Sequence, residues 1–585
     1  MAQACDAPFI IGVSGHRDLH PPDTQGLRAA VAEFLQKIRA CLPDTEIRVV
    51  AGMASGADLL TVRVALDLGF GVDAVLPLPL RHYAADFEAS AFRELEALLA
   101  HPNVRCTELS LRTEEGSGGH SSDGERRDAH YLNLTRTLIG SCHLLLALWD
   151  GETSVLPGGT ADTVLRYLDL RSDGRPQDSP ILFADAPPEQ NPDSRLVYWI
   201  PTARRGDGCG GKPPAPCYLS GLGDDVLQRW ASMPKPFHEQ LLELDAYNRE
   251  YRNLAGSHRT VAAPDSLMRS LPCAVPLPQP ARAWLERIDA QYGKADALAL
   301  HFQVRSDRLF LFFTATTFLM GLAYLAYDKF VANRLLLLVY LLVLLSGFGL
   351  YSFLHDRQWF GKHLTYRALA ETLRAKFYLS VAGADHLVDA DEVISLSGID
   401  RFHGFGWIAY VLSGLKRPGD CATESAHDEC LDSVETAWIE SQRRYFARKV
   451  ERLERNGRRT RLLKRSLFAI ILLVIASLLL LGHRANHPSA AVGVSLKGTL
   501  TFVLGLPALV LGVWELHQNK MAMRELLWQY RNQLDHFSRA RTQLAKTSAP
   551  SRRRQVLARL GKDSLMESYL WTIHRYHREH EPGRG

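Results

Sequence analysis

Three short glycine-bearing turns carry residues that could hold an anion. The first is GVSGHR (12–17), the second GMASGAD (52–58), and the third joins WDG (149–151) to PGGT (157–160). Glycine lets backbone N–H groups approach a ligand closely, small hydroxyls add donors, and arginine offers a planar fork to phosphate oxygens. Residues of these types in this pattern favour a phosphate-bearing ligand.

The candidate ligand-binding residues are Gly12, Ser14, Gly15, His16, Arg17, Gly52, Ser55, Gly56, Asp58, Tyr83, Asp150, Gly158, Gly159 and Thr160. Arg17 is the first candidate for phosphate, with an ion pair to Asp18 or Asp58 as the alternative. His16 is expected either to touch phosphate or base, or to satisfy neighbouring carbonyls.

The other side chains have expected roles of their own. Ser55, Gly56 and Thr160 suit a phosphate cradle, or else ordinary helix capping. Asp58 and Asp150 suit ribose hydroxyls, because carboxylates repel phosphate. Tyr83 is expected to wall a base, or else to pack inside the protein.

A parallel α/β sheet would bring these turns together. Residues 8–185 alternate strands (Phe9–Val13, Ile47–Ala51, Val72–Leu76, His143–Leu148) with helical patterns such as Thr24–Cys41 and Gly56–Leu68. Strand, helix and strand at this interval indicate right-handed crossovers, so the carboxyl ends of the strands share one edge. Glu114–Asp128 is expected to be a mobile surface loop, and residues 186–235, rich in Pro and Gly, an irregular extension.

Four apolar runs follow in two pairs, at Leu309–Tyr327 with Leu335–Leu354 and at Ser466–Gly482 with Gly498–Trp514. They match the length of a membrane-spanning helix, and the alternative is a set of buried core helices. The predicted fold class is an α/β Rossmann-like N-terminal domain with a parallel sheet, plus an all-α membrane domain with four transmembrane helices and cytoplasmic helical extensions. The predicted segments are the α/β domain (1–185), the irregular extension (186–235), a helical connector (236–307), the first transmembrane hairpin (308–355), a middle cytoplasmic helical segment (356–465), the second transmembrane hairpin (466–516) and C-terminal cytoplasmic helices (517–585).

Charge and cysteine usage narrow the possible partners. Basic residues at 452–465 and at 520 and 524 flank the second pair of runs, which places the N-terminus, the middle segment and the C-terminus in the cytoplasm. The net charge of +4 implies no general attraction to nucleic acid. The nine scattered cysteines fit a reducing cytosol and match neither a zinc spacing nor a disulfide framework. No metal site and no signal peptide are expected.

The series GHR, GMASGAD, LPLPLRHYAADF, LLALWDG and PGGT resembles the SLOG superfamily, which includes DNA-processing protein A and the LOG-type cytokinin-activating enzymes. This resemblance implies a nucleotide-derived ligand over the carboxyl edge of the sheet, with phosphate near the glycine turns. The enzymes of that group carry PGGxGTxxE, whereas here Gly158-Gly159-Thr160 is followed by Ala161-Asp162-Thr163-Val164. We therefore expect a binding site without catalytic residues or a required cofactor. The alternative is a nucleotide hydrolase in which Asp150 or Asp162 replaces the glutamate.

The tail Leu560–Trp571 with His574-Arg575, together with Tyr366–Phe377, is similar to the SLATT-like membrane effectors that accompany SLOG sensors in bacterial immunity. This resemblance implies a homo-oligomer in the bacterial inner membrane that permeabilises or depolarises it once a cyclic nucleotide or ADP-ribose-type messenger binds. The messenger, the lipid bilayer and a messenger-producing enzyme are then its partners, and nucleic acid is not. A ligand-gated channel outside immunity, a simple membrane tether and a scaffold are the alternatives.

Overall fold

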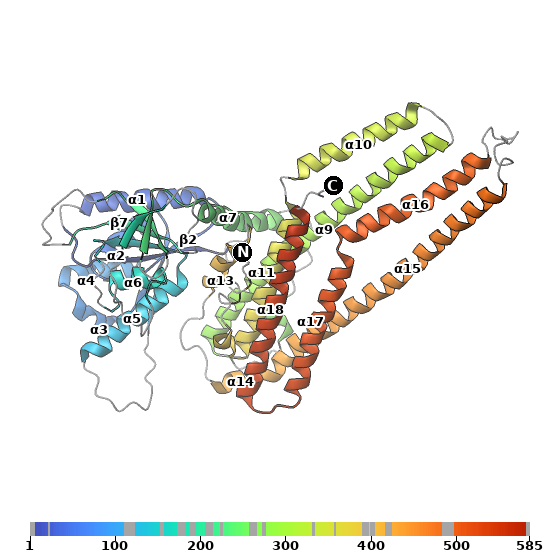
Figure 1. Ribbon diagram of the computed structural model, residues 1–585. Helices are drawn as coiled ribbons and strands as arrows, with labels where there is room; N and C mark the ends of the chain where they lie inside the picture. The colour runs from blue at the N-terminus through green and yellow to red at the C-terminus, as the bar shows by residue number, and fades with distance from the viewer. Residues whose placement is uncertain are drawn as a thin grey trace. The chain divides into compact units, whose positions relative to one another are not determined.

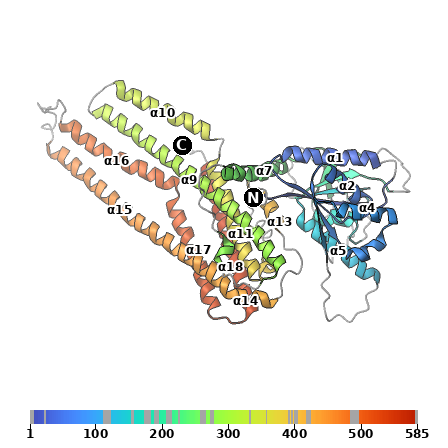
Figure 2. The same cartoon turned by 180° about the vertical axis from the view of Figure 1, so that it is seen from behind.

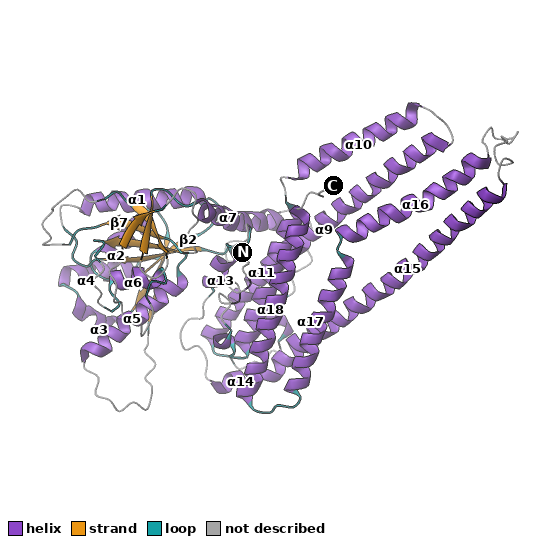
Figure 3. Cartoon of the chain, viewed as in Figure 1, coloured by secondary structure: helices purple, strands orange, loops and turns teal. Residues whose placement is uncertain are grey.

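A computed structural model describes residues 6–20, 24–109, 123–152, 157–171, 182–186, 195–204, 214–222, 226–256, 266–271, 277–329, 334–355, 358–388, 393, 397, 404–415, 424–481 and 496–580. The chain divides into two compact units. Unit 1 contains residues 1–263, 277–294 and 394–423, and unit 2 contains residues 264–276, 295–393 and 424–585. Strands are confined to unit 1 among these residues, and unit 2 is helical (Figure 3).

Unit 1 is built on one nine-stranded sheet of order β4-β3-β2-β1-β5-β7-β8-β9-β6. Its strands are β1 (Phe9–Gly15), β2 (Ile47–Ala51), β3 (Gly71–Leu76), β4 (Val104–Glu108), β5 (Leu144–Trp149), β6 (Leu182–Asp185), β7 (Val197–Pro201), β8 (Cys217–Leu222) and β9 (Val226–Trp230). The strands from β4 through β7 pair in parallel, while β8 runs antiparallel to both of its neighbours. The predicted α/β class is confirmed, with the addition of this antiparallel strand.

Helices cover both faces of the sheet, because the strand order reverses at β1 and right-handed crossovers then lie on opposite faces. The helices of this region are α1 (Thr24–Cys41), α2 (Ala57–Asp67), α3 (Leu80–Tyr83), α4 (Ala89–Leu99), α5 (Asp123–Ser141) and α6 (Thr160–Tyr167). Ile10, Val50 and Leu145 pack in one buried cluster with residues of α5 and α6. Right-handed crossovers through α1 and α2 place these two helices on the opposite face (Figure 1).

Two expectations for the first 235 residues are corrected by the structure. Strands β7, β8 and β9 lie inside the segment 186–235 that was expected to be irregular, where hydrogen bonds to β5 and among themselves hold them in the sheet. Residues 123–128 of the expected mobile loop form the start of α5, and the remainder of that loop, 114–122, lies outside the described residues.

Unit 1 is completed by segments far along the chain. Helix α7 (Lys235–Gly256) and the first part of α9 (Gln279–Lys329) belong to it, and so does α13 (Ile408–Ser413). The ring of Tyr410 packs against Phe9 at the start of β1, with ring centroids 5.9 Å apart. The indole of Trp284 donates to the carbonyl of Leu415 at 3.0 Å. The segment 394–423, predicted as part of the middle cytoplasmic segment, therefore belongs with the sheet.

Unit 2 holds four helices that are long and apolar enough to cross a membrane. They are α9, α10 (Arg334–His355), α15 (Ser441–Leu481) and α16 (Leu496–Lys520), and each contains one predicted apolar run within its described residues. The remaining helices of the unit are α8 (Leu267–Ser270), α11 (Trp359–Val381), α14 (Glu424–Val434), α17 (Met523–Leu544) and α18 (Pro550–His580). Helices α9 and α10 lie side by side, as do α15 and α16 (Figure 2).

The two apolar hairpins end in similar junctions. A non-glycine residue in the left-handed region, Gln358 after α10 and Ala522 after α16, breaks each helix, with φ of 45° and 49°. A Tyr-Arg pair follows eight and nine residues later in both cases, as Tyr366-Arg367 and Tyr530-Arg531. Each arginine bonds an acid on the helix that enters its hairpin: Arg367 bonds Asp296 at 3.2 Å, and Arg531 bonds Glu454 at 2.6 Å.

Candidate functional site

The three glycine turns meet where the strand order reverses. From β1 the chain continues to β2, β3 and β4 on one side of the sheet, and β5 then pairs with β1 on the other side. In open α/β sheets the crevice for a ligand lies outside the carboxyl ends of the strands at such a switch point. The turns after β1, β2 and β5 are adjacent here, as predicted from their positions in the sequence.

The first and second turns are in direct backbone contact. The N–H of Ala57 donates to the carbonyl of His16 at 3.0 Å. Gly56 has φ of +85°, and a Cβ at this position would lie 2.3 Å from the carbonyl oxygen of Arg17. A Cβ on Gly15 would lie 2.3 Å from that of Ala57. Both glycines therefore permit the close approach of the two turns.

His16 joins the turn after β1 to the turn after β5. Its N–H donates to the carbonyl of Leu148 at 3.1 Å, and its Nε2 accepts from the N–H of Asp150 at 3.0 Å. Burial lowers the pKa of His16, which is only 6% exposed, although the Asp150 carboxylate 3.1 Å away opposes that shift. Because the amide can only donate, Nε2 acts as an acceptor on a neutral ring. The His16 ring therefore bonds a backbone N–H of the turn after β5, whereas the expected alternative to a ligand contact was a bond to neighbouring carbonyls.

Neither aspartate considered as a replacement for the missing glutamate is free. In Asp150, Oδ2 accepts from Nε of Arg204 at 2.8 Å and Oδ1 accepts from the N–H of Glu152 at 2.9 Å. Asp162 is fully buried. Its carboxylate accepts from the N–H of Gly158 and from Nε of Arg166, both at 2.8 Å. These carboxylates fix the turns that carry them.

Arg17 presents an exposed cation at this edge. Its guanidinium lies 5.0 Å from the ring centroid of Tyr131 on α5. The Tyr131 hydroxyl donates to Asp86, which also receives a hydrogen bond from Arg127. Among the described residues Arg17 makes no ion pair, so the alternative pairing with Asp18 or Asp58 is not what the structure has. Burial acts to lower the pKa of Arg17, but Tyr131 and the nearby Asp86 carboxylate raise it overall. An aromatic face and a neighbouring negative charge thus hold the guanidinium without a direct ion pair.

Hydroxyl donors and two helix N-termini lie at the same carboxyl edge of the sheet as this cation. The hydroxyls of Ser14, Ser55 and Thr160 have no hydrogen-bond partner within the ranges that the structure describes. Helix α2 begins directly after Gly56 and α6 directly after Gly159, so both present N–H groups at the carboxyl edge. Helix N-termini favour anions through these groups and the helix dipole. The arrangement can hold phosphate oxygens by charge, backbone donors and hydroxyls together.

Three candidate residues, Gly12, Gly52 and Tyr83, are buried. Tyr83 is completely buried, and its hydroxyl donates to the carbonyl of Gly52 at 3.1 Å, so its ring does not wall a base. Gly12 lies within β1, where a Cβ would stand 2.7 Å from Cδ2 of Leu138 on α5. Gly52 is buried, and its Cβ would meet Leu134 at the same distance of 2.7 Å. The two glycines leave room for the α5 side chains Leu138 and Leu134, and Tyr83 fixes the turn at Gly52.

Asp58 is buried in the first turn of α2. Its Oδ2 accepts from the N–H of Ala54 at 3.1 Å and closes the GMASGAD turn, while no described residue donates to Oδ1. Burial raises the pKa of Asp58 to about 7, against the opposing effects of the Ala54 hydrogen bond and the charge of Arg17. Protonated Asp58 is therefore favoured by the folded state.

This pKa predicts a pH-dependent stability. Between the ordinary value of 3.8 and about 7, the folded protein holds a proton that the unfolded chain releases, so stability falls as the pH rises through this window. The slope reaches at most about 1.4 kcal/mol per pH unit. We expect Asp58→Asn to lose less stability than the wild type between pH 5 and pH 8, measured by the hydrogen-exchange protection factors of the β1 and β2 amides in the full chain. Asp67→Asn, at an exposed site on the same helix, should follow the wild type; equal slopes in all three proteins would contradict the assignment.

Sequence reasoning missed two functional side chains, Tyr131 and Arg204. Tyr131 follows a Gly- and Ser-rich segment, and only its i, i+4 spacing from Arg127, with both side chains bonding Asp86, marks it. Arg204 follows β7, a strand in the segment expected to be irregular. Within the described ranges, no group of three or more His, Cys, Asp or Glu residues has the geometry of a metal site.

Comparisons with known proteins give little beyond this geometry. No protein-family model and no curated protein matches the chain. Among solved structures, the X-ray structure of DNA processing protein A from Streptococcus pneumoniae is similar over 31% of this chain, with 19% sequence identity and a TM-score of 0.19. The match spans about half of that protein, 51% of its length. The likeness is weak, so the site description rests on the contacts above.

Proposed function

We propose that the protein is a membrane effector that binds a nucleotide-derived second messenger at the carboxyl edge of the sheet and responds by permeabilising or depolarising the bacterial inner membrane. The observation that carries the proposal is the exposed Arg17, which makes no ion pair with a described residue, at the same sheet edge as two helix N-termini and three hydroxyls that have no partner among the described residues. A cyclic nucleotide or an ADP-ribose derivative supplies the phosphates that this set would bind. The resemblance of GHR, GMASGAD and PGGT to SLOG sensors points the same way.

The membrane part of the proposal rests on the four apolar helices. Only 6–11% of the residues in the most apolar window of each helix are buried within the chain. The other residues of these windows need lipid or another copy of the protein to cover them. We propose that these helices span the bilayer as two hairpins with the N-terminus, the middle segment and the C-terminus in the cytoplasm, and that several copies assemble around a path through the membrane. Ligand binding opens that path only if the open assembly binds the messenger more tightly than the closed one.

Helix α9 offers a direct connection between binding and response. It is continuous from Gln279 to Lys329, and its first residues belong to unit 1 whereas its later residues form an apolar helix of unit 2. We propose that a change at residues 279–294 of unit 1 reaches the apolar part of the same helix.

Binding without hydrolysis is favoured by the engaged carboxylates. Asp150 accepts hydrogen bonds through both of its carboxylate oxygens. Asp162 does the same and is also fully buried. Neither is therefore poised as a general base. A hydrolase would release base or nicotinamide from nucleoside monophosphates or NAD. We expect no such release above the level of an Asp150→Asn variant; release that disappears in that variant would establish the alternative.

The test of the proposal uses the full chain reconstituted in liposomes of anionic lipid loaded with a self-quenching dye. A panel of cyclic oligonucleotides, ADP-ribose derivatives and NAD is added, with protein-free liposomes and a known ligand-gated channel as controls. We expect one class of nucleotide to accelerate leakage and also to raise the thermal midpoint, because a ligand at 100 times its dissociation constant adds about 2.7 kcal/mol of stability. A thermal shift without leakage would leave a sensor without a pore, and neither response with any nucleotide would end the proposal.

A further inference from the structure

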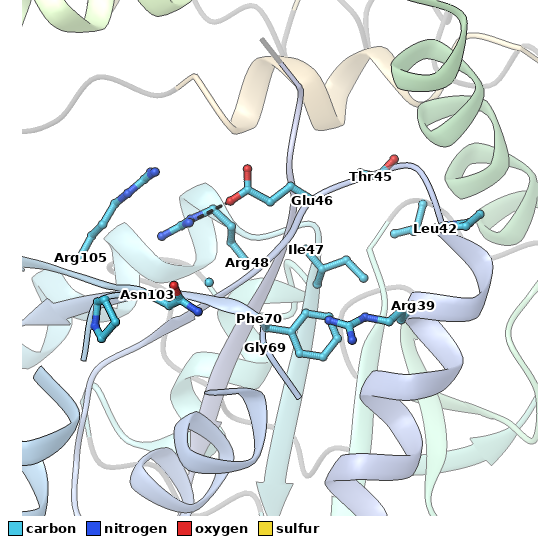
Figure 4. Close-up of a pocket in the computed structure, with 13 residues that line it drawn as sticks. Arg39, Leu42, Thr45, Glu46, Ile47, Arg48, Gly69, Phe70, Asn103 and Arg105 are labelled. Carbon is cyan, nitrogen blue, oxygen red and sulfur yellow. Dashed lines mark hydrogen bonds and ion pairs between the residues drawn. The ribbon is translucent and has the colours of Figure 1, made fainter. Parts of the chain in front are cut away.

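A cavity lies at the amino edge of the same sheet, opposite the edge that carries the three glycine turns (Figure 4). Its volume is about 470 Å³, and it is lined by the ends of strands and turns that precede β2, β3 and β4. Ile47, Gly71 and Asn103 mark these three positions. The lining includes three arginines, Arg39, Arg48 and Arg105. The charge balance of this cluster decides what the cavity can hold.

Arg48 is a structural cation. Its side chain is 8% exposed, its Nε donates to Asp73 at 2.8 Å, its second terminal nitrogen donates to the same carboxylate, and Glu46 accepts from the remaining one at 2.9 Å. A Cβ on Gly71 would lie 2.4 Å from this guanidinium, so the glycine leaves it room. The two acids near the cavity are therefore both committed to Arg48.

Arg105 is left without an acid by this arrangement. It is the register partner of Asp73 across β3 and β4, and its side chain is exposed. The Asp73 carboxylate turns toward Arg48, and no ion pair of Arg105 exists in the part of the chain that the structure describes. Figure 4 shows its guanidinium extending at the cavity rim beside the Arg48–Glu46 pair.

Two more arginines add unneutralised charge at this edge. One terminal nitrogen of Arg39 donates to the carbonyl of Leu68 at 2.9 Å, and its guanidinium stacks 4.0 Å from the ring centroid of Phe70. Arg287, from the unit 1 part of α9, donates to the carbonyl of Gly414 at 3.3 Å. Burial lowers the pKa of Arg287, and the nearby charge of Arg105 adds to this effect. Each keeps further N–H donors, and neither pairs with a carboxylate among the described residues.

We propose that this amino-edge cavity binds a small phosphate-bearing anion through Arg105 and Arg39, which both line it. Arg287 does not line the cavity, and its charge near Arg105 adds to the positive field there. Arg105, Arg39 and Arg287 bring three positive charges and pair with no carboxylate among the described residues. Arg48 with Asp73 and Glu46 carries one net negative charge, so the edge stays net positive and its field favours an anion. Phosphate groups accept the guanidinium fork through two parallel hydrogen bonds, and the cavity is large enough for a phosphorylated small molecule. The site is separate from the carboxyl edge, so it does not depend on the function proposed above.

The test measures binding of inorganic pyrophosphate to the full chain in detergent, by titration calorimetry at low salt. We expect Arg105→Ala to weaken binding by at least about tenfold and Arg105→Glu to abolish it, because each removes a charge-assisted donor. Arg105 is exposed, so these variants should keep the wild-type circular dichroism. Lys37→Ala, which removes an exposed cation that pairs with Glu33 on α1, is the matched control and should bind as the wild type does.

An Arg17→Ala protein separates the two edges of the sheet. Pyrophosphate should still bind to it, and this binding should still be lost on adding Arg105→Glu. Pyrophosphate binding that is lost in Arg17→Ala but kept in Arg105→Glu would overturn the proposal, and so would an absence of binding to the wild type. A free phosphate and a lipid headgroup share this chemistry. Vesicles with and without phosphatidylglycerol, added during the pyrophosphate titration, distinguish them. Loss of pyrophosphate binding only with phosphatidylglycerol vesicles assigns the cavity to a lipid headgroup. Unchanged pyrophosphate binding with both kinds of vesicle assigns it to a soluble ligand.

Discussion

Replacing Gly56 by alanine is expected to disrupt the carboxyl edge of the sheet. Gly56 has φ of +85° and ψ of −116°, a region that L-residues with a side chain scarcely enter. The new Cβ would also stand 2.3 Å and 2.6 Å from the carbonyl oxygens of Arg17 and His16. These atoms belong to the backbone, so relief requires the turns after β1 and β2 to separate and the Ala57–His16 hydrogen bond to break.

Strain and the lost hydrogen bond together should cost about 3 kcal/mol or more. The measurement is amide hydrogen exchange of the full chain in detergent, because a chain of two units does not have a single unfolding free energy. We expect exchange in β1, β2 and β5 to rise by roughly a hundredfold, which corresponds to about 3 kcal/mol, while exchange in α15 stays unchanged.

The control for this variant is Gly26→Ala. Gly26 lies in α1, and a Cβ there would meet nothing within 4 Å. Alanine is favoured over glycine inside a helix by roughly 0.5–1 kcal/mol, so this variant should be at least as stable as the wild type. Wild-type protection in the Gly56→Ala protein would show that the two turns are not held together as the structure has them.

Much of the scaffold could be predicted from the sequence because its signals are local. Thr24–Cys41 was predicted as a helix and forms α1 with the same bounds, since its apolar residues recur at helical spacing. The apolar runs were equally clear, because a helix that is apolar all round needs no knowledge of its neighbours. The convergence of the three turns followed from the handedness of parallel crossovers alone.

The remaining strands depended on partners far away in the chain. Tyr218 on β8 pairs with Tyr198 on β7 and with Trp230 on β9, in a stretch where Pro and Gly suggest irregular backbone. A strand as short as β7 is specified by the edge of β5 that it completes. The return of α13 to unit 1, where Tyr410 packs on Phe9, has no local signature for the same reason.

Within the site, residue type predicted position better than role. Arg17, Ser55 and Thr160 lie at the carboxyl edge as expected, whereas His16 and Tyr83 are buried and bond the backbone. Burial is a property of the packed structure, so a histidine at a strand end looks the same in sequence whether it faces a ligand or a neighbouring turn. The aromatic partner of Arg17 is Tyr131, about a hundred residues away, which no spacing in the first turn could reveal.

Arg17→Ala is expected to remove most of the affinity for the nucleotide identified by the panel above. Arg17 is exposed in the turn after β1, three residues after Ser14, and it makes no ion pair with a described carboxylate. Hydrogen bonds to charged groups contribute about 1.5–3 kcal/mol each, and a fork engages two phosphate oxygens. We therefore expect an affinity between about tenfold and a hundredfold lower, measured by calorimetry on the full chain, with unchanged hydrogen exchange in the absence of ligand.

Two further variants separate charge, geometry and packing. Arg17→Lys keeps the charge but loses the fork, so its affinity should fall between those of the wild type and Arg17→Ala. Tyr131→Phe keeps the ring beneath the guanidinium but removes the hydroxyl that donates to Asp86. If Tyr131 positions Arg17 only through its ring, the affinity of Tyr131→Phe for the nucleotide should be close to that of the wild type. The affinity of Tyr131→Ala should approach that of Arg17→Ala, because the guanidinium loses its fixed orientation. Full affinity in Arg17→Ala would instead mean that the cation serves its contact with Tyr131 and that the phosphate is held by the N-termini of α2 and α6 alone.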